Sequence, residues 1–194
     1  MRISHFLLAL AFASFSELVL AQDSKLTNDL IWYSREFRHE SVSGVNSMKD
    51  GLHYTRLEWN DEVGSAIVKY EYATGDSLGV LASSKDILNN NTTSIEGYQF
   101  SADESKLLIQ TETNNIYRHS FSANYYIYNR ATKRATPLAD FTQGKQRLAQ
   151  FSPKGDMVAF VRNNNIFIHD LEFREEEQIT FDGKKNHLIN GYPD

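Results

Sequence analysis

One arginine, Arg118, stands out among the residues of this sequence that could do chemistry. It precedes His119 and lies between the aromatic residues Tyr117 and Phe121. A guanidinium is planar and permanently charged, so it can hold a carbonyl or a carboxylate through paired hydrogen bonds. The same pattern also fits a surface arginine in a local ion pair of small energetic value. We predict that Arg118, and with less support His119, binds substrate.

The other chemistries have little support in the sequence. The histidines are isolated, without the spacing of a metal site, and no glycine-rich phosphate loop is present. We therefore expect no metal, no cofactor and no catalytic nucleophile in this chain. Glu175-Glu176-Glu177 could bind an amine, but it fits better as a solvated strand at the edge of a sheet, where charges block further pairing.

Composition excludes further classes of protein. The 194 residues carry a net charge of -5, which argues against a basic groove for nucleic acid. The chain contains no cysteine, so disulfides, thiolate zinc sites and cysteine nucleophiles are excluded together.

The first residues have the pattern of an export signal. Arg2 provides a positive start, Phe6 to Phe15 forms an apolar core, and Val19-Leu20-Ala21 offers a cleavage site before Gln22. We predict that residues 1–21 are a signal peptide and that the mature protein is periplasmic, on the cell surface or secreted. The alternative is a short uncleaved membrane anchor, although Ser14, Ser16 and Glu17 interrupt the apolar run.

An internal repeat organises the rest of the chain. Phe100-Ser101 and Phe151-Ser152 each precede a predicted strand, and Ile109 aligns with Phe160, which gives a period of about fifty residues. The copy that contains Arg118 is longer, because Glu112 to Ala123 replaces a short turn. We expect this excess to be a loop on a binding face that starts at an Asn114-Asn115 turn. The strands predicted on alternation are 52–57, 66–72, 106–111, 125–128, 157–161 and 166–169.

These strands predict an all-β fold. Units of four strands that each bury their faces against neighbours would form the blades of a partial β-propeller, with about three blades in this chain. A β-sandwich also has many short strands, but it would not repeat the same Phe-Ser turn before a strand.

Four segments resemble the propeller of dipeptidyl peptidase IV-type enzymes of the prolyl oligopeptidase family. The most specific is the arginine segment Tyr117 to Tyr128. Ser47 to Gly51, followed by Tyr54-Thr55, resembles an early blade signature, and Phe151 to Gly155 resembles a later one. Asn190 to Asp194 is similar to the residues just before the family's Trp-x-Tyr-Glu-Glu element.

The resemblance implies an eight-bladed propeller followed by an α/β-hydrolase domain. Residues 22–194 would be the N-terminal part of that propeller, with the hydrolase domain absent. Such serine-type peptidases remove Xaa-Pro and Xaa-Ala dipeptides from peptides with a free N-terminus, and they commonly form homodimers. In the family, the arginine that matches Arg118 contacts a substrate carbonyl and pairs with the double glutamate, which binds the α-amine.

The chain ends at Asp194, before the double glutamate and before any Ser-His-Asp triad. We therefore expect an N-terminal fragment that is inactive alone. The competing hypothesis is a non-enzymatic periplasmic propeller that binds a partner.

Overall fold

The computed structural model of the chain describes residues 26–38, 43–88 and 94–192. The chain divides into two compact units, Met1–Ser41 and Val42–Asp194. The described part of the first unit holds one short helix, α2 (Asn28–Trp32), in which the Thr27 side chain accepts a hydrogen bond from the amide of Leu30 at 3.1 Å. The predicted signal peptide, residues 1–21, lies outside the described residues.

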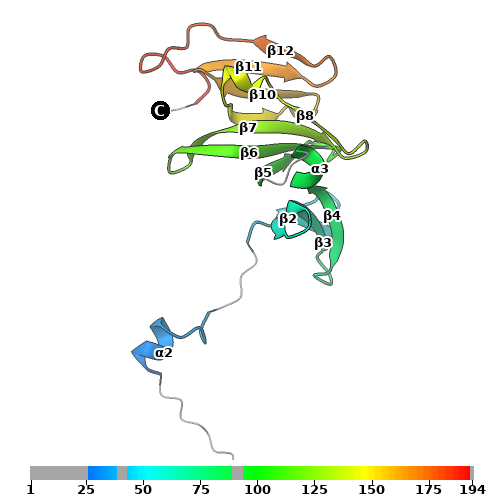
Figure 1. The fold of residues 1–194 in the computed structure, drawn as a ribbon, viewed down its shortest axis with the longest axis vertical. Coiled ribbons are helices and arrows are strands. Elements are labelled where there is room, and N and C mark those ends of the chain that lie inside the picture. The colour runs from blue at the N-terminus through cyan, green and yellow to red at the C-terminus, as the bar shows by residue number, and fades with distance from the viewer. Residues whose placement is uncertain (1–25, 39–42, 89–93, 193–194) are drawn as a thin grey trace, which may run out of the picture. The chain divides into compact units, whose positions relative to one another are not determined.

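The second unit is built from three four-stranded antiparallel sheets (Figure 1). We refer to them as blades 1, 2 and 3 in chain order. Strand order follows chain order within each blade, so each is a meander. The all-β expectation is confirmed. Blade 1 consists of β1 (Asn46–Ser47), β2 (His53–Asn60), β3 (Gly64–Glu71) and β4 (Ser77–Ser83), and blade 2 consists of β5 (Ile95–Phe100), β6 (Lys106–Tyr117), β7 (Ser120–Asn129) and β8 (Arg134–Pro137). Blade 3 consists of β9 (Arg147–Phe151), β10 (Met157–Arg162), β11 (Asn165–Asp170) and β12 (Glu175–Gln178).

Two short helical segments join the blades. Helix α3 (Ser84–Leu88) follows blade 1, and the 3-10 helix η1 (Phe141–Gln143) lies between blades 2 and 3. No helix among the described residues combines the length and apolar character needed to cross a membrane.

The sequence repeat corresponds to a repeated turn. Ser101 follows β5 and its hydroxyl donates to the carboxylate of Asp103 at 2.6 Å, while Ser152 follows β9 and donates to Asp156 at 2.6 Å. These hydrogen bonds lower the pKa of both carboxyls. The serine thus ties the turn before the second strand of blades 2 and 3, which explains why the sequence repeats there.

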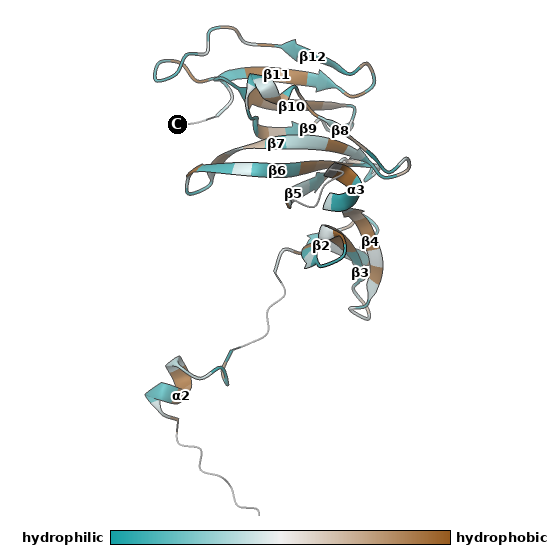
Figure 2. Cartoon of the chain, in the orientation of Figure 1, coloured by the Kyte–Doolittle hydropathy of each residue, from teal (hydrophilic) through white to brown (hydrophobic). Residues whose placement is uncertain are grey.

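The core lies between neighbouring blades. Successive side chains of a strand point to opposite faces, so Leu107 and Ile109 of β6 pack toward blade 1, while Leu108 packs toward blade 3. Blade 2 therefore buries both faces, and its central strands need apolar residues at consecutive positions. Figure 2 shows the contrast with β12, which is hydrophilic along its length at the edge of blade 3.

Candidate functional site

The Arg118 segment is a strand hairpin and not the predicted loop. Strands β6 and β7 continue to a tight turn at Arg118-His119, with Asn115 opposite Phe121 and Tyr117 opposite Ser120 (Figure 1). The expected Asn114-Asn115 turn is wrong, because cross-strand pairing overrides the turn preference of asparagine there. The residues that lengthen this repeat therefore extend the ladder past the body of blade 2.

A bulge separates this extension from the body of blade 2. The register of β6 against β7 shifts between Thr111 and Asn114, and Glu112 has a left-handed φ of 50°. The amide of Thr113 donates to the carboxylate of Glu96 at 2.7 Å, and the Asn124 side chain donates to the Glu112 carboxylate at 2.7 Å. Because a bulge bends its strand and redirects the residues beyond it, this one determines where the hairpin tip points.

Arg118 lies at the hairpin tip with a left-handed φ of 34°. Its side chain and that of His119 are exposed, and the guanidinium carbon of Arg118 lies 5.4 Å from the centre of the Tyr117 ring. Within the described part of the chain, neither side chain takes part in an ion pair. The predicted site residues are therefore accessible, and the Arg118 guanidinium faces an aromatic ring rather than a carboxylate.

A cleft of about 820 Å³ opens beside the outer part of this hairpin. Its walls are the hairpin, the start and turn of blade 3, and the segment that leaves blade 3. Tyr117 and Tyr192 both line it, so two segments singled out from the sequence share one cavity. Pro193 and Asp194, the end of the second segment, lie outside the described residues.

The cleft is basic. Lys145, Arg147 and Lys185 line it, and no aspartate or glutamate is among its lining residues in the described part of the chain. A cavity lined by one sign of charge raises the local concentration of groups of the opposite sign. The arrangement therefore suits carbonyl or carboxylate oxygens. Sequence reasoning missed Lys145 and Arg147, although their alternation around Gln146 where β9 begins was a visible signal.

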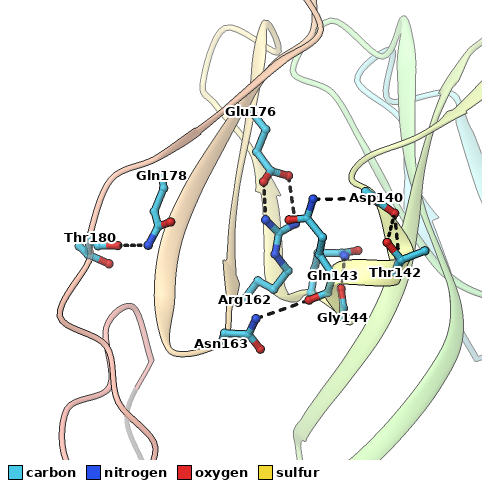
Figure 3. A network of polar contacts seen from close by, with 10 residues as sticks. Asp140, Thr142, Gln143, Gly144, Arg162, Asn163, Glu176, Gln178 and Thr180 are labelled. Carbon is cyan, nitrogen blue, oxygen red and sulfur yellow. Dashed lines mark hydrogen bonds and ion pairs between the residues drawn. The ribbon is translucent and has the colours of Figure 1, made fainter.

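Glu175 to Glu177 lie in β12, the edge strand of blade 3, as expected for a solvated edge. Glu176 has an additional partner, because it forms an ion pair with the buried guanidinium of Arg162 (Figure 3). The Arg162 guanidinium carbon also lies 4.3 Å from the centre of the Phe167 ring. No pattern in the sequence indicates this pair.

The same network reaches the connection from blade 2. Asn163 donates to the backbone oxygen of Gln143 at 3.4 Å, and Gln143 donates to Asp140 at 3.5 Å (Figure 3). Hydrogen bonds from Thr142 to Asp140 lower the pKa of that carboxyl. These contacts join the connection from blade 2 to the turn between β10 and β11 of blade 3.

One pentapeptide has the spacing of a serine nucleophile motif. Gly75-Asp76-Ser77-Leu78-Gly79 matches Gly-x-Ser-x-Gly, which in hydrolases forms a sharp turn between a strand and a helix. Here Ser77 is exposed at the start of edge strand β4, and no hydrogen bond joins it to a histidine among the described residues. The match is therefore coincidental, and Ser77 lacks the setting of a nucleophile.

The described residues contain no group of three or more His, Asp or Glu side chains arranged to hold a metal ion.

Comparison with known proteins shows which proteins this chain is similar to. Residues 101–194 match the family model described as the dipeptidyl peptidase IV N-terminal region. A probable dipeptidyl-aminopeptidase B from Tuber melanosporum is 29% identical over 173 residues, which are 84% of this chain and 18% of that protein. A probable dipeptidyl-aminopeptidase B from Aspergillus niger is 42% identical over 91 residues, 46% of this chain and 10% of that protein.

A solved structure agrees in sequence and fold. The crystal structure of Porphyromonas gingivalis dipeptidyl peptidase 4 has 41% identity and a TM-score of 0.68, over 78% of this chain and 21% of that one. The chain thus spans about a fifth or less of the length of these proteins. In sequence and in fold, the chain is similar to the N-terminal propeller region of dipeptidyl peptidase IV-type proteins.

Proposed function

We propose that this chain supplies the first blades of the propeller in an exported serine-type dipeptidyl peptidase that removes Xaa-Pro and Xaa-Ala dipeptides from peptide N-termini. Arg118 is its substrate-binding residue, with His119 beside it. The nucleophile and its triad belong to a hydrolase domain outside this chain, so the 194 residues alone are inactive. The full protein would act as a homodimer on peptides with a free N-terminus.

The observation that carries the proposal is the shared cleft. Tyr117, next to Arg118, and Tyr192 line the same cavity although they are far apart in the sequence. In the family that the chain resembles, the paired glutamates that bind the α-amine come after the segment matching Asn190 to Asp194. The segment that ends at Tyr192 in the described structure therefore shares the cleft with the Arg118 hairpin.

The Arg118 guanidinium and the amine-binding carboxylates would recognise different groups of the same dipeptide. The Arg118 guanidinium donates to the backbone carbonyl of the bound dipeptide, and carboxylates located after Tyr192 hold the ammonium of its first residue. Only a chain end carries that ammonium, and a buried carboxylate left without it is costly. Cleavage is thereby confined to the N-terminus of a peptide.

The test is Arg118→Ala in the protein expressed with its natural continuation, with steady-state kinetics on Gly-Pro-4-nitroanilide. A lost hydrogen bond to a charged group is worth about 1.5–3 kcal/mol, so we expect kcat/KM to fall roughly 10- to 150-fold, chiefly through KM. Arg118→Lys keeps the charge but loses the planar fork, so it should recover only part of the loss.

Arg174→Ala is the matched control. Arg174 is exposed and has a left-handed φ of 58° at the turn between β11 and β12, and it does not line the cleft. Its replacement should leave the kinetics unchanged. Equal kinetics for Arg118→Ala and the wild type would remove Arg118 from the site. Absence of any dipeptidyl peptidase activity in the natural protein would favour the non-enzymatic partner-binding propeller.

The export proposal has a separate test. N-terminal sequencing of the protein recovered from outside the cytoplasm should begin near Gln22. A start at Met1 in a membrane fraction would support the uncleaved anchor instead.

A further inference from the structure

Three consecutive residues, Lys145, Gln146 and Arg147, attach the start of blade 3 to blade 2. Gln146 is fully buried, and its backbone N and O each pair with Ala123 of β7 at 2.9 Å. Its side-chain amide donates to the oxygen of Gly144 at 2.8 Å. Because alternate residues of an extended segment point to the same side, Lys145 and Arg147 both face the basic cleft.

Lys145 holds the hairpin wall of the cleft. Its ammonium donates to the side-chain oxygen of Asn114 at 3.0 Å and to the backbone oxygen of Glu112. These acceptors lie in the bulge of β6 and just beyond it, where the strand bends toward the Arg118 tip. The contact thus joins blade 3 to the bend that determines where the hairpin points.

Beyond this bend, the partly buried side chain of Phe121 in β7 packs against the core between blades 2 and 3. Ile116 and Tyr117 are 55% and 67% exposed, so these two side chains of its outer part add little to the core. The orientation of the hairpin therefore depends on the Phe121 contact, on backbone pairing and on the polar contacts at the bulge.

Arg147 holds the opposite wall. Its guanidinium carbon lies 3.7 Å above the centre of the Tyr192 ring, a distance suited to a cation–π contact. The Tyr192 hydroxyl donates to the side chain of Asn164 at 2.9 Å, and the amide of Asn190 donates to the backbone oxygen of Asn164 at 3.0 Å. The segment that leaves blade 3 is therefore fastened both at the tyrosine ring and at its hydroxyl.

We propose that Lys145 and Arg147 are positioning residues that together set the separation of the two walls of the substrate cleft. Lys145 orients the hairpin that carries Arg118, and Arg147 orients the segment that leads to the amine-binding carboxylates. This inference rests on the proposed function of Arg118. Both residues act through their neighbours and neither touches the reacting atoms.

The test compares Lys145→Met and Arg147→Leu in the protein with its natural continuation, again with Gly-Pro-4-nitroanilide. Misplacing a binding group by about 1 Å can cost up to about a hundredfold, so we expect KM to rise about tenfold in each variant. The change in kcat should be less than about twofold, because the nucleophile is elsewhere. Lys145→Arg should restore most of the loss, since it still donates to both acceptors.

Hydrogen exchange distinguishes the effects of the two substitutions on the two walls of the cleft. Lys145→Met should reduce amide protection in residues 114–122 and leave residues 188–192 unchanged, whereas Arg147→Leu should do the reverse. Lys154→Met is the matched control: Lys154 is an exposed lysine of blade 3 that does not line the cleft, and its replacement should change neither readout.

A double variant distinguishes this inference from the proposed function. If Lys145 acts through Arg118, Lys145→Met should add almost nothing in an Arg118→Ala background. If Arg118→Ala raises KM while Lys145→Met and Arg147→Leu do not, the positioning role is wrong and the proposed function stands. If Arg118→Ala leaves KM unchanged, the proposed function is wrong, and the positioning role that rests on it is wrong as well. Should Lys145→Met not fold, Asn114→Ala removes the same hydrogen bond from the other side.

Discussion

The guanidinium of Arg162 in β10 is ion-paired with the carboxylate of Glu176 in β12, across the intervening strand β11 of blade 3. The Arg162 side chain is only 3% exposed and that of Glu176 is 25% exposed. A buried charge that loses its partner is much more costly than an exposed one. Glu176 thus differs from its two neighbours in β12, although all three are glutamates in the same edge strand.

Glu176→Gln should lower the free energy of unfolding by about 3 kcal/mol, the lower end for breaking a buried ion pair, because Glu176 remains partly exposed. Urea unfolding followed by circular dichroism measures it. Glu175→Gln and Glu177→Gln, which leave Arg162 paired, should stay within about 0.5 kcal/mol of the wild type. Adding Arg162→Met to Glu176→Gln should recover part of the loss. Equal effects of all three glutamine substitutions would show that the pair contributes nothing.

Strand β6 offers a matched pair of isoleucines on either side of the bulge. Ile109 is fully buried between blades 1 and 2, whereas Ile116 is 55% exposed near the hairpin tip. Ile109→Ala should cost about 2–5 kcal/mol of unfolding free energy through lost burial and a new cavity. Ile116→Ala should cost about 0.5 kcal/mol or less, and the same urea titration compares them. A large effect at Ile116 would mean that another surface covers the hairpin.

The repeat and the central strands were predictable because burial on both faces leaves a pattern in the sequence. Leu107, Leu108 and Ile109 are consecutive apolar residues, and the Phe-Ser turn is tied by the serine hydroxyl in blades 2 and 3. Strand β4 was missed because Ser77 to Val80 are exposed and include Gly79, so they carry no alternation.

The candidate site was predictable only in part. Arg118 was identified from its residue type and its neighbours. The bulge that bends its hairpin, however, depends on contacts with Glu96, from another strand, and with Lys145, from the start of blade 3. The distance between Tyr117 and Tyr192 likewise depends on the packing of blades 2 and 3. Tertiary contacts of this kind leave no local pattern, since each partner alone is an ordinary polar or charged residue.

His169 of β11 provides a pH-dependent prediction. Its ring is half-buried, and its Nδ1 atom has no hydrogen-bond partner among the described residues. Burial lowers the pKa of His169 below its ordinary value, partly opposed by the nearby carboxylates of Glu176 and Asp170. The folded protein therefore releases the proton more readily than the unfolded chain does.

The sign of the effect follows from this difference. Between the lowered pKa of the folded state and the ordinary value of about 6.5, the unfolded chain binds more protons, so acidification favours unfolding. The stability that His169 contributes is complete above that ordinary value and is lost as the pH falls through the window below it. His169→Gln should flatten the unfolding free energy measured by urea titration between about pH 7 and pH 5. His187→Gln, on an exposed residue of the last segment, is the control; an equally steep curve in His169→Gln would assign the pH dependence to another group.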